Sequence, residues 1–280
     1  RLAPAITQLI DDGDYRPLEA LLSDLPRDMR KVDTGALERA RQYLDWAAAN
    51  PQPTSLPLEP LPEEWPLIEA MFMIPLADDV ASFLELREQL ADSSGLSGDL
   101  LDSANIAPAV RRARACRDNM RTPVQIEAGV RHWHAIASEG CAGLHPGHFK
   151  YTQNWSARNP LLKRVDPALA SATFQCFVEE IYTRVPPGML RAAICMMVLC
   201  DLHVFADGNG RIGTIWMNRE LEWNDCMPAL FRRDLSLKGE LATAMTTVRG
   251  NGGDLSPLLS VMLRAQHHAR DFCRELAAVT

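Results

Sequence analysis

The apolar run Leu190–Leu202, LRAAICMMVLCDL, constrains the fold most, because it decides the structure of the glycine-rich stretch that follows it. The run is too long for an ordinary strand and is rich in Ala, Met and Leu, so it predicts a buried helix. The next stretch, HVFADGNGRIGT, places Gly208, Gly210 and Gly213 in the G-x-G-x-x-G spacing of a dinucleotide-binding loop. Such a loop follows a strand inside a βαβ unit, and no strands alternate with helices here, although Asp234 lies about 20 residues further on. The context excludes the dinucleotide fold and predicts a tight loop between two helices.

Most other segments also show helical periodicity. We expect Thr34 to cap a helix that Asn50 and Pro51 end. Further helices are expected from about residue 67 to 90 with a break near Pro75, after the loop at 92–99, and from Pro123 onward. The pairs Asp166–Pro167 and Ser256–Pro257 are each expected to supply an N-cap and a first-turn proline.

One segment, GHFKYTQNWSARNP at 147–160, has the composition of extended chain and predicts a short hairpin or flap. The fold class is therefore all-α with a small β-hairpin flap. We divide the chain into an N-terminal helical segment (1–50), a proline-rich linker or strap (51–66), a helical extension (67–122), a core that holds the glycine motif (123–270) and the end of the C-terminal helix (271–280). The six prolines of 51–66 fit a free linker and a packed strap equally well.

Charge and composition exclude several classes of function. A net charge of −7 argues against a general nucleic-acid or anionic-membrane binder, and the run Ala192–Cys200 is too short to cross a bilayer. No leader peptide is visible, and because the first residue is Arg we expect an excised fragment or a processed form. The seven cysteines include no C-x-x-C pair, which indicates buried thiols in a reducing compartment such as the cytoplasm. His132 and His134 point to different sides of a helix, so a helical zinc site is not expected.

The motif loop itself gathers groups that suit phosphate chemistry. Glycines at 208 and 210 allow positive φ, and the amides of a loop that opens a helix form an anion site. Arg211 adds a forked, permanently charged donor, and Asp207 is an oxygen ligand suited to Mg²⁺. His203, at the end of the buried helix, has a pKa suited to general base catalysis. A structural interhelical turn would explain the glycines but not the three functional side chains.

This stretch resembles the signature loop of the Fic/Doc family, H-x-F-x-[D/E]-G-N-G-R-x-x-R. The resemblance rests on His203, Phe205, Asp207, Gly208, Asn209, Gly210 and Arg211, on the flap-like segment before them, on Met217–Asn218 in the next helix and on a closing helix near 252–263. It extends over roughly 123 to 269. Val204 and Thr214 depart from the pattern, since they stand where the family has a common proline and its second arginine.

The resemblance implies a nucleotidyltransferase acting on proteins. It implies that His203 deprotonates a Ser, Thr or Tyr hydroxyl, which attacks a nucleotide, most often ATP, with Mg²⁺ on Asp207. The phosphates would be bound by Gly208, Asn209, Gly210 and Arg211, with Phe205 packed inward to fix the loop and Asn218 near the nucleotide's sugar or base. The flap, near 147–159, would dock the target protein by strand addition. Trp155 on the flap is equally consistent with target contact and with packing.

Three alternatives remain open from the sequence. With Thr214 in place of the second arginine, the donor could be UTP or phosphocholine-bearing, the reaction could be a phosphotransfer, or the fold could be a degenerate binding module. Many members of the family also carry an inhibitory helix, [S/T]-x-x-x-E-[G/N], whose Glu pairs with the second arginine of the signature. The nearest string in this sequence, Thr34–Glu38 followed by Arg39, matches that pattern poorly. We expect a cytoplasmic protein, or an effector secreted into a host cytosol, without nucleic acid or a membrane span. The target protein and the oligomeric state are not indicated.

Overall fold

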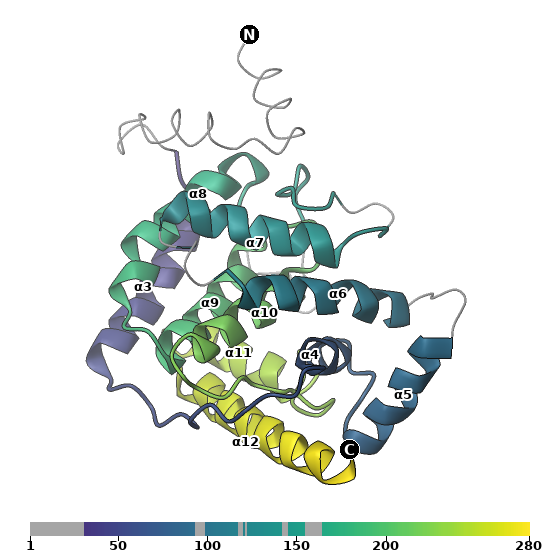
Figure 1. The fold of residues 1–280 in the computed structure, drawn as a ribbon. Coiled ribbons are helices and arrows are strands. Elements are labelled where there is room, and N and C mark those ends of the chain that lie inside the picture. Colours follow the sequence, from purple (N-terminus) through teal and green to yellow (C-terminus); the bar gives the residue numbers. More distant parts are fainter. Residues whose placement is uncertain (1–30, 93–98, 117–119, 121, 142–144, 155–163) are drawn as a thin grey trace. The chain divides into compact units, whose positions relative to one another are not determined.

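The computed structural model describes residues 31–92, 99–116, 120, 122–141, 145–154 and 164–280. Contacts divide the chain into two compact units, 1–32 and 33–280. The second unit is built from helices (Figure 1). Within the described residues, the β pairing consists of an isolated antiparallel bridge between Pro57 and Cys226. The all-α class predicted from periodicity is confirmed.

The first helices follow the predicted order with shifted ends. They are α3 (Thr34–Ala49), α4 (Trp65–Met73), α5 (Val80–Asp92) and α6 (Asp99–Arg114). The N-cap of α3 is Asp33, whose carboxylate accepts the Ala36 amide at 3.0 Å, and not Thr34 as predicted. Aspartate is the better acceptor for the free amides of a first turn, so the helix begins one residue earlier than predicted, at Thr34.

The remaining elements run through the glycine motif to the C-terminal end of the unit. They are α7 (Pro123–Ala137), the 3₁₀ turns η3 (Pro167–Leu169) and η4 (Tyr182–Arg184), α8 (Ala170–Glu180), α9 (Met189–Leu202), α10 (Asn209–Glu222), α11 (Glu240–Gly250) and α12 (Ser256–Val279). Asp166 caps η3 as its side chain predicts, at Ala168 N. Ser256 is not the N-cap that its pairing with Pro257 predicts: Leu255 takes that place, and the Ser256 amide donates to Asp254.

Residues 51–64 run as an extended strap between α3 and α4. Its backbone meets the turn after α10, where Leu58 N donates to Asp225 O at 2.9 Å and Met227 N donates to Leu56 O at 2.8 Å. The buried Gln266 of α12 accepts the Leu56 amide at 3.3 Å. Figure 1 shows the strap passing from the end of α3 along α12 to α4. Its backbone groups therefore find partners on the core, as a packed strap requires.

An aromatic cluster joins the early helices to the C-terminal one. Phe72 of α4 and Phe83 of α5 meet Phe272 of α12 edge-on, with ring centroids 5.3 and 5.9 Å apart. All three rings are buried, together with Trp65. Burying a large apolar side chain stabilises a fold by about 1.5–3 kcal/mol, so α4 and α5 are integral to the core.

The central helix α9 is buried on every side. Apart from Arg191, each of its residues is shielded from solvent. It packs against α10 most extensively and also against α3 and α12. A helix that is apolar all round can be stable only inside a protein, so the other helices must enclose it. Its C-terminal end delivers the motif loop to the surface of this core.

A buried ion pair fastens α10 to α4. Arg219 Nη2 donates to Glu69 Oε2 at 2.9 Å, and both residues are at most 1% exposed. The same carboxylate oxygen accepts the Trp65 indole N–H, and Asn218 donates to the other oxygen at 3.0 Å. Because removing one member of such a network leaves an uncompensated charge, α4 fixes the orientation of α10.

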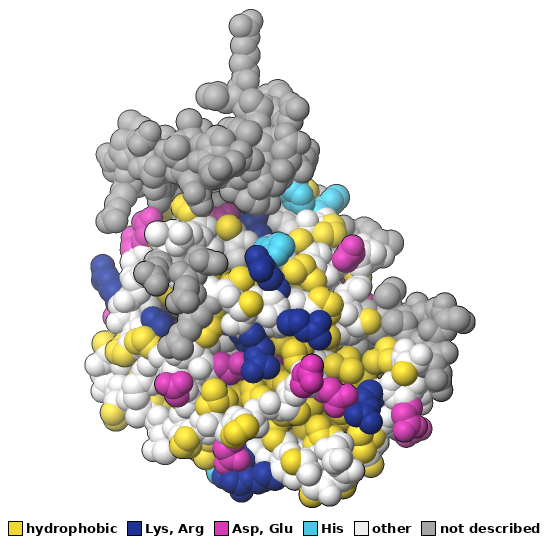
Figure 2. All heavy atoms as spheres, in the orientation of Figure 1, with side chains coloured by type: hydrophobic (Ala, Val, Ile, Leu, Met, Phe, Trp, Pro, Cys, Tyr) yellow, Lys and Arg dark blue, Asp and Glu magenta, His cyan; other side chains and the backbone are white. Residues whose placement is uncertain are grey.

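Three further observations bear on the expectations from composition. On the face drawn in Figure 2, the side chains of Lys and Arg lie among those of Asp and Glu, so this face presents no continuous patch of one sign. None of the helices in the described ranges combines the length and the apolar character that a membrane span needs. All seven cysteines are free thiols.

Candidate active site

His203 is the C-cap of α9 and turns the chain out of the helix. Its backbone is left-handed, with φ 53° and ψ 54°, and its amide donates to Leu199 O at 3.0 Å. Non-glycine residues adopt this conformation at a cost, which is common where function fixes a side chain. The ring Nδ1 lies 3.3 Å from Cys200 O. A carbonyl only accepts, so Nδ1 carries the hydrogen and Nε2 keeps its lone pair.

Burial lowers the pKa of His203 to about 4, and the positive charges of Arg164 and Lys150 act in the same direction. The Cys200 carbonyl and Asp207 oppose this shift. The imidazole is therefore neutral at neutral pH. A neutral imidazole with a free Nε2 is the form that can take a proton.

Phe205 and Asn209 hold the motif loop in place. Phe205 is completely buried, and its ring stacks on His134 with centroids 3.9 Å apart and planes 2° from parallel. Asn209 accepts the Phe205 amide and donates to the Phe205 carbonyl, both at 2.9 Å. The Asn209 side chain is thus committed inside the loop, and only its backbone amide, in the first turn of α10, is available for an anion.

Gly208 and Gly210 of the motif have different structural roles. Gly208 is the N-cap of α10 with φ 78°, where a side chain would be strained, as the sequence predicts. Gly210 does not have the positive φ that we predicted for it: it lies in the first turn of α10. What it needs is space, because a Cβ there would lie 2.5 Å from Cδ1 of Leu237.

Asp207 and Arg211 lie in a pocket of about 330 Å³ together with His203. The first turn of α10, at Gly208, Asn209 and Gly210, forms part of its wall. The remaining lining comes from α4 and the turn after it (Met73, Ile74, Pro75), from Asp102 of α6 and from Ser236, Leu237 and Lys238. The structure therefore brings the predicted base, the predicted metal ligand and the predicted anion-binding turn to one cavity.

Arg211 is already engaged by acidic groups. Its Nη1 lies 3.3 Å from Asp102 Oδ2 and its Nη2 lies 3.9 Å from Asp207 Oδ2. Arg211 and Asp102 are about a quarter exposed, so this pairing is screened by water and weak. Asp102 had no signal in the sequence, because nothing in its surroundings links α6 to the motif.

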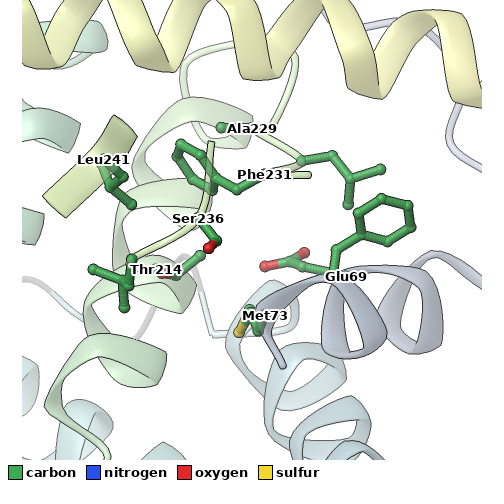
Figure 3. A pocket seen from close by; sticks show the side chains of 10 residues that line it. Glu69, Met73, Thr214, Ala229, Phe231, Ser236 and Leu241 are labelled. Atoms are coloured by element: carbon green, nitrogen blue, oxygen red, sulfur yellow. The ribbon is translucent and has the colours of Figure 1, made fainter. Parts of the chain in front are cut away.

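Thr214 and Asn218 are not among the residues that line that pocket. The Thr214 hydroxyl donates to Gly210 O at 3.0 Å, and the residue lines a small neighbouring cavity of about 20 Å³ that shares Ser236 and Leu237 with the pocket. Figure 3 shows Glu69 pointing into this small cavity, with Thr214 and Ser236 among its walls. The Asn218 amide is fully buried and exchanges hydrogen bonds with the Ala229 backbone at 2.9 and 3.1 Å. Its contact with a nucleotide stays a prediction.

His134 connects α7 to the motif loop, whereas the sequence indicated only that it does not belong to a helical zinc site. It is 1% exposed, its Nδ1 accepts the Gly147 amide at 3.0 Å, and its Nε2 lies 3.2 Å from Asp207 O. Burial lowers the pKa of His134 to about 4, so the ring is neutral. Nε2 then carries the hydrogen and donates it to the Asp207 carbonyl. The sequence signal that was missed is an apolar helix with a histidine on its buried face.

The described part of the predicted flap, 147–154, contains no strand. It is attached to the motif loop instead: Lys150 N donates to Val204 O at 2.8 Å, and Asn154 Nδ2 donates to Phe205 O at 2.8 Å. The rest of the predicted flap, with Trp155, lies outside the described residues. The hairpin stays a prediction.

Comparisons with known proteins give a family match over part of the sequence and similar folds. Residues 127–221 match the model of the Fic/DOC family. The fold is similar to that of Fic-1 (residues 134–508) from C. elegans, with a TM-score of 0.56 and 15% identity over 88% of this chain and 74% of that one. It is also similar to a Fic domain containing signaling protein from Bacteroides thetaiotaomicron, with a TM-score of 0.58 and 15% identity over 85% of this chain and 97% of that one. No curated protein matches the sequence.

Proposed function

We propose that this chain, whose residues 127–221 match the Fic/DOC family and whose fold is that of Fic-domain proteins, transfers a nucleoside monophosphate onto a hydroxyl of a target protein. The family is one of transferases that move phosphate-containing groups onto proteins. The finer assignment is AMP from ATP, with His203 as the base. One observation carries it: a base, an acid and a helix N-terminus with an arginine share one pocket.

The proposed reaction is an in-line displacement at the donor's α-phosphorus. The target's Ser, Thr or Tyr oxygen forms a bond to that phosphorus, and the bond to the oxygen that bridges to the β-phosphate breaks. Pyrophosphate leaves with that electron pair, and the hydroxyl proton passes to Nε2 of His203. The amides of Asn209, Gly210 and Arg211 head α10 and face developing negative charge without any reorganisation.

Asp207 fits the role of a Mg²⁺ ligand held together with substrate phosphates. Its carboxylate is 68% exposed and lies in the pocket. No cluster of three or more metal-binding side chains is found in the described parts of the chain, but Mg²⁺ is commonly held by one or two carboxylates and by substrate phosphates and water. When bound, the ion would neutralise charge on the phosphates.

Lys238 is the second cation of the pocket. In the described part of the chain its ammonium has no ion-pair partner, whereas Arg211 faces Asp102. A donor that enters beside α10 therefore meets an uncommitted positive charge among the residues that line the pocket. This supports a donor with more than one phosphate even though Thr214 contributes no charge.

Transfer is tested with labelled ATP, UTP, GTP and CTP, Mg²⁺ and a cell lysate, comparing the natural protein with His203→Ala. Loss of a positioned base is expected to lower the rate by about 10²–10⁴-fold. His267→Ala, an exposed histidine on α12, is the matched control and is expected to transfer normally. Labelling of a target with UTP but not with ATP would identify UTP, and not ATP, as the donor. Equal labelling by His203→Ala would show that His203 is not the base, and no labelling from any donor would favour the binding module.

A further inference from the structure

The C-terminal end of α9 is capped by a segment that comes from far along the chain. Arg164 Nη1 donates to Cys200 O at 2.5 Å and reaches Asp201 O at 3.5 Å, while Val165 N donates to Leu202 O at 3.1 Å. The last carbonyls of a helix have no partners within it, so these bonds satisfy them. Arg164 thus caps the C-terminal end of α9, the helix that His203 follows.

Arg164 and His203 share one acceptor. The Cys200 carbonyl that accepts from Arg164 is also the partner of His203 Nδ1, at 3.3 Å. A carbonyl oxygen has two lone pairs and can serve both donors. This arrangement fixes the imidazole tautomer and places a permanent positive charge beside the ring.

Lys150 contacts the motif loop just after His203, at Val204. Its backbone amide donates to Val204 O at 2.8 Å, and its Nζ donates to Asn154 Oδ1 at 2.7 Å. Asn154 in turn donates to Phe205 O at 2.8 Å. The ammonium is therefore attached, through one amide, to the residue two positions after His203.

Both cations are buried and neither is paired in the usual way. Lys150 is 3% and Arg164 6% exposed. In the described residues, neither has a carboxylate within ion-pair distance, and Arg164 Nε has no partner at all. The nearby Asp201 is occupied by Tyr43 at 2.6 Å and by Arg249 at 2.7 Å. Buried charges are normally paired with an opposite charge. Two buried cations without such a partner therefore indicate a site where positive charge has a function.

We propose that Arg164 and Lys150, here called the cationic collar, are positioning residues that keep His203 neutral, with Nε2 unprotonated, when an anionic donor enters the pocket. This inference rests on the proposed function. Without nearby positive charge, an imidazole beside several phosphates would gain a proton before the reaction and could not act as a base. The collar offsets that attraction.

The electrostatics agree in sign. Besides burial, Arg164 and Lys150 lower the pKa of His203, which is about 4, and the Cys200 carbonyl and Asp207 raise it. Burial, followed by Arg164, lowers the pKa of Lys150 to about 8, while Asp166 and Asp33 raise it. Lys150 is thus still largely charged at neutral pH. Removing either cation is expected to raise the pKa of His203, because its protonated form then meets less positive charge.

The experiment follows the His203 ring by NMR titration in the complete protein, where Arg164→Met and Lys150→Met each remove a charge. Each is expected to raise the pKa of His203 by about one unit, a tenfold change in proton affinity. Arg164→Lys and Lys150→Arg keep the charge and are expected to restore most of the shift. Arg264→Met, which removes an exposed arginine paired with Glu240, is the matched control. If Arg164→Met does not fold, the two Lys150 variants carry the test.

Adding inorganic pyrophosphate and Mg²⁺ gives a second arm that needs no target protein. The pKa of His203 is expected to rise on binding, and to stay about one unit higher in Lys150→Met than in the natural protein. In the transfer assay, the acid limb of the pH profile moves upward by the same amount. An unchanged pKa in folded Lys150→Met, or an equal shift in Arg264→Met, overturns the collar. Shifts as expected without transfer from any donor would instead overturn the proposed function alone.

Discussion

Replacing Thr214 by arginine is expected to destabilise the protein without improving its grip on a triphosphate. The position corresponds to the second arginine of the Fic/Doc signature, so the change restores the sequence motif. In the structure, however, Thr214 is 5% exposed and lines the small cavity beside Glu69, not the neighbouring pocket of His203 (Figure 3). Its hydroxyl is committed to Gly210 O.

The magnitude follows from the size of that cavity. About 20 Å³ accommodates roughly one water molecule, far less than the additional atoms of an arginine side chain. Overpacking of this kind typically costs about 1–3 kcal/mol. For a protein of this size, each kcal/mol lowers the Tm by about 2–4 °C, so we expect a fall of about 2–12 °C. The guanidinium would be held near Glu69.

Urea unfolding and calorimetric titration with ATP and ADP measure the two effects separately. Thr214→Val, of nearly the same size, is the control and is expected to lose only the helical hydrogen bond, about 1 kcal/mol. The ratio of ATP to ADP affinity is expected to be the same in both variants and in the natural protein. A Thr214→Arg protein of unchanged stability that binds ATP tenfold more tightly would refute the reasoning, because its side chain would then reach the pocket.

Three other substitutions test contacts at the site and beneath it. Asp102→Asn releases Arg211, and since an exposed pair is worth at most about 1 kcal/mol, calorimetry is expected to show pyrophosphate binding up to about fivefold tighter; weaker binding would mean that Asp102 orients the arginine productively. Gly210→Ala brings a Cβ against a terminal methyl of Leu237, and because that flexible side chain can move aside while alanine favours a helix, urea unfolding is expected to show a change of at most about 1 kcal/mol; a larger loss would mean that Leu237 is held in place. Glu69→Ala removes one of the two carboxylates that pair with the buried Arg219, leaving Glu222 at 2.6 Å, and takes away the acceptor of the Trp65 and Asn218 side chains. Each buried donor left unsatisfied costs about 1–3 kcal/mol, so a lower urea midpoint is expected, and a loss under about 1 kcal/mol would contradict the assigned role of the network.

The sequence predicted the helices because their signals are local. The run 190–202 is a helix at nearly the predicted bounds, since its apolar composition leaves no other buried structure of that length. The ends were less certain: Asp33 displaced Thr34 as a cap because neighbouring residues compete for the same free amides. Gly208 was read correctly from its chemistry, whereas Gly210 is needed for space beside Leu237, which only tertiary packing reveals.

The site was predictable where it is one continuous loop and not where other segments supply it. His203, Asp207 and Arg211 lie within nine residues, and their types indicate phosphate chemistry by themselves. Asp102 and His134 come from α6 and α7, Lys150 lies in the segment predicted only as a flap, and Arg164 follows that segment. No spacing rule connects such positions along the chain, because packing of helices brings them together.

The all-round burial of α9 has a consequence for how the protein is made. On the ribosome, α9 emerges before α10 and α12, the helices that cover much of its surface, so its apolar sides stay uncovered until those later segments have been synthesised. Exposed apolar surface of this kind is where chaperones bind and nascent chains aggregate. The loop that carries His203 therefore cannot take its final shape until the last helix has closed over the core. A chain that stalls between α10 and α12 would hold every motif residue and still have no site.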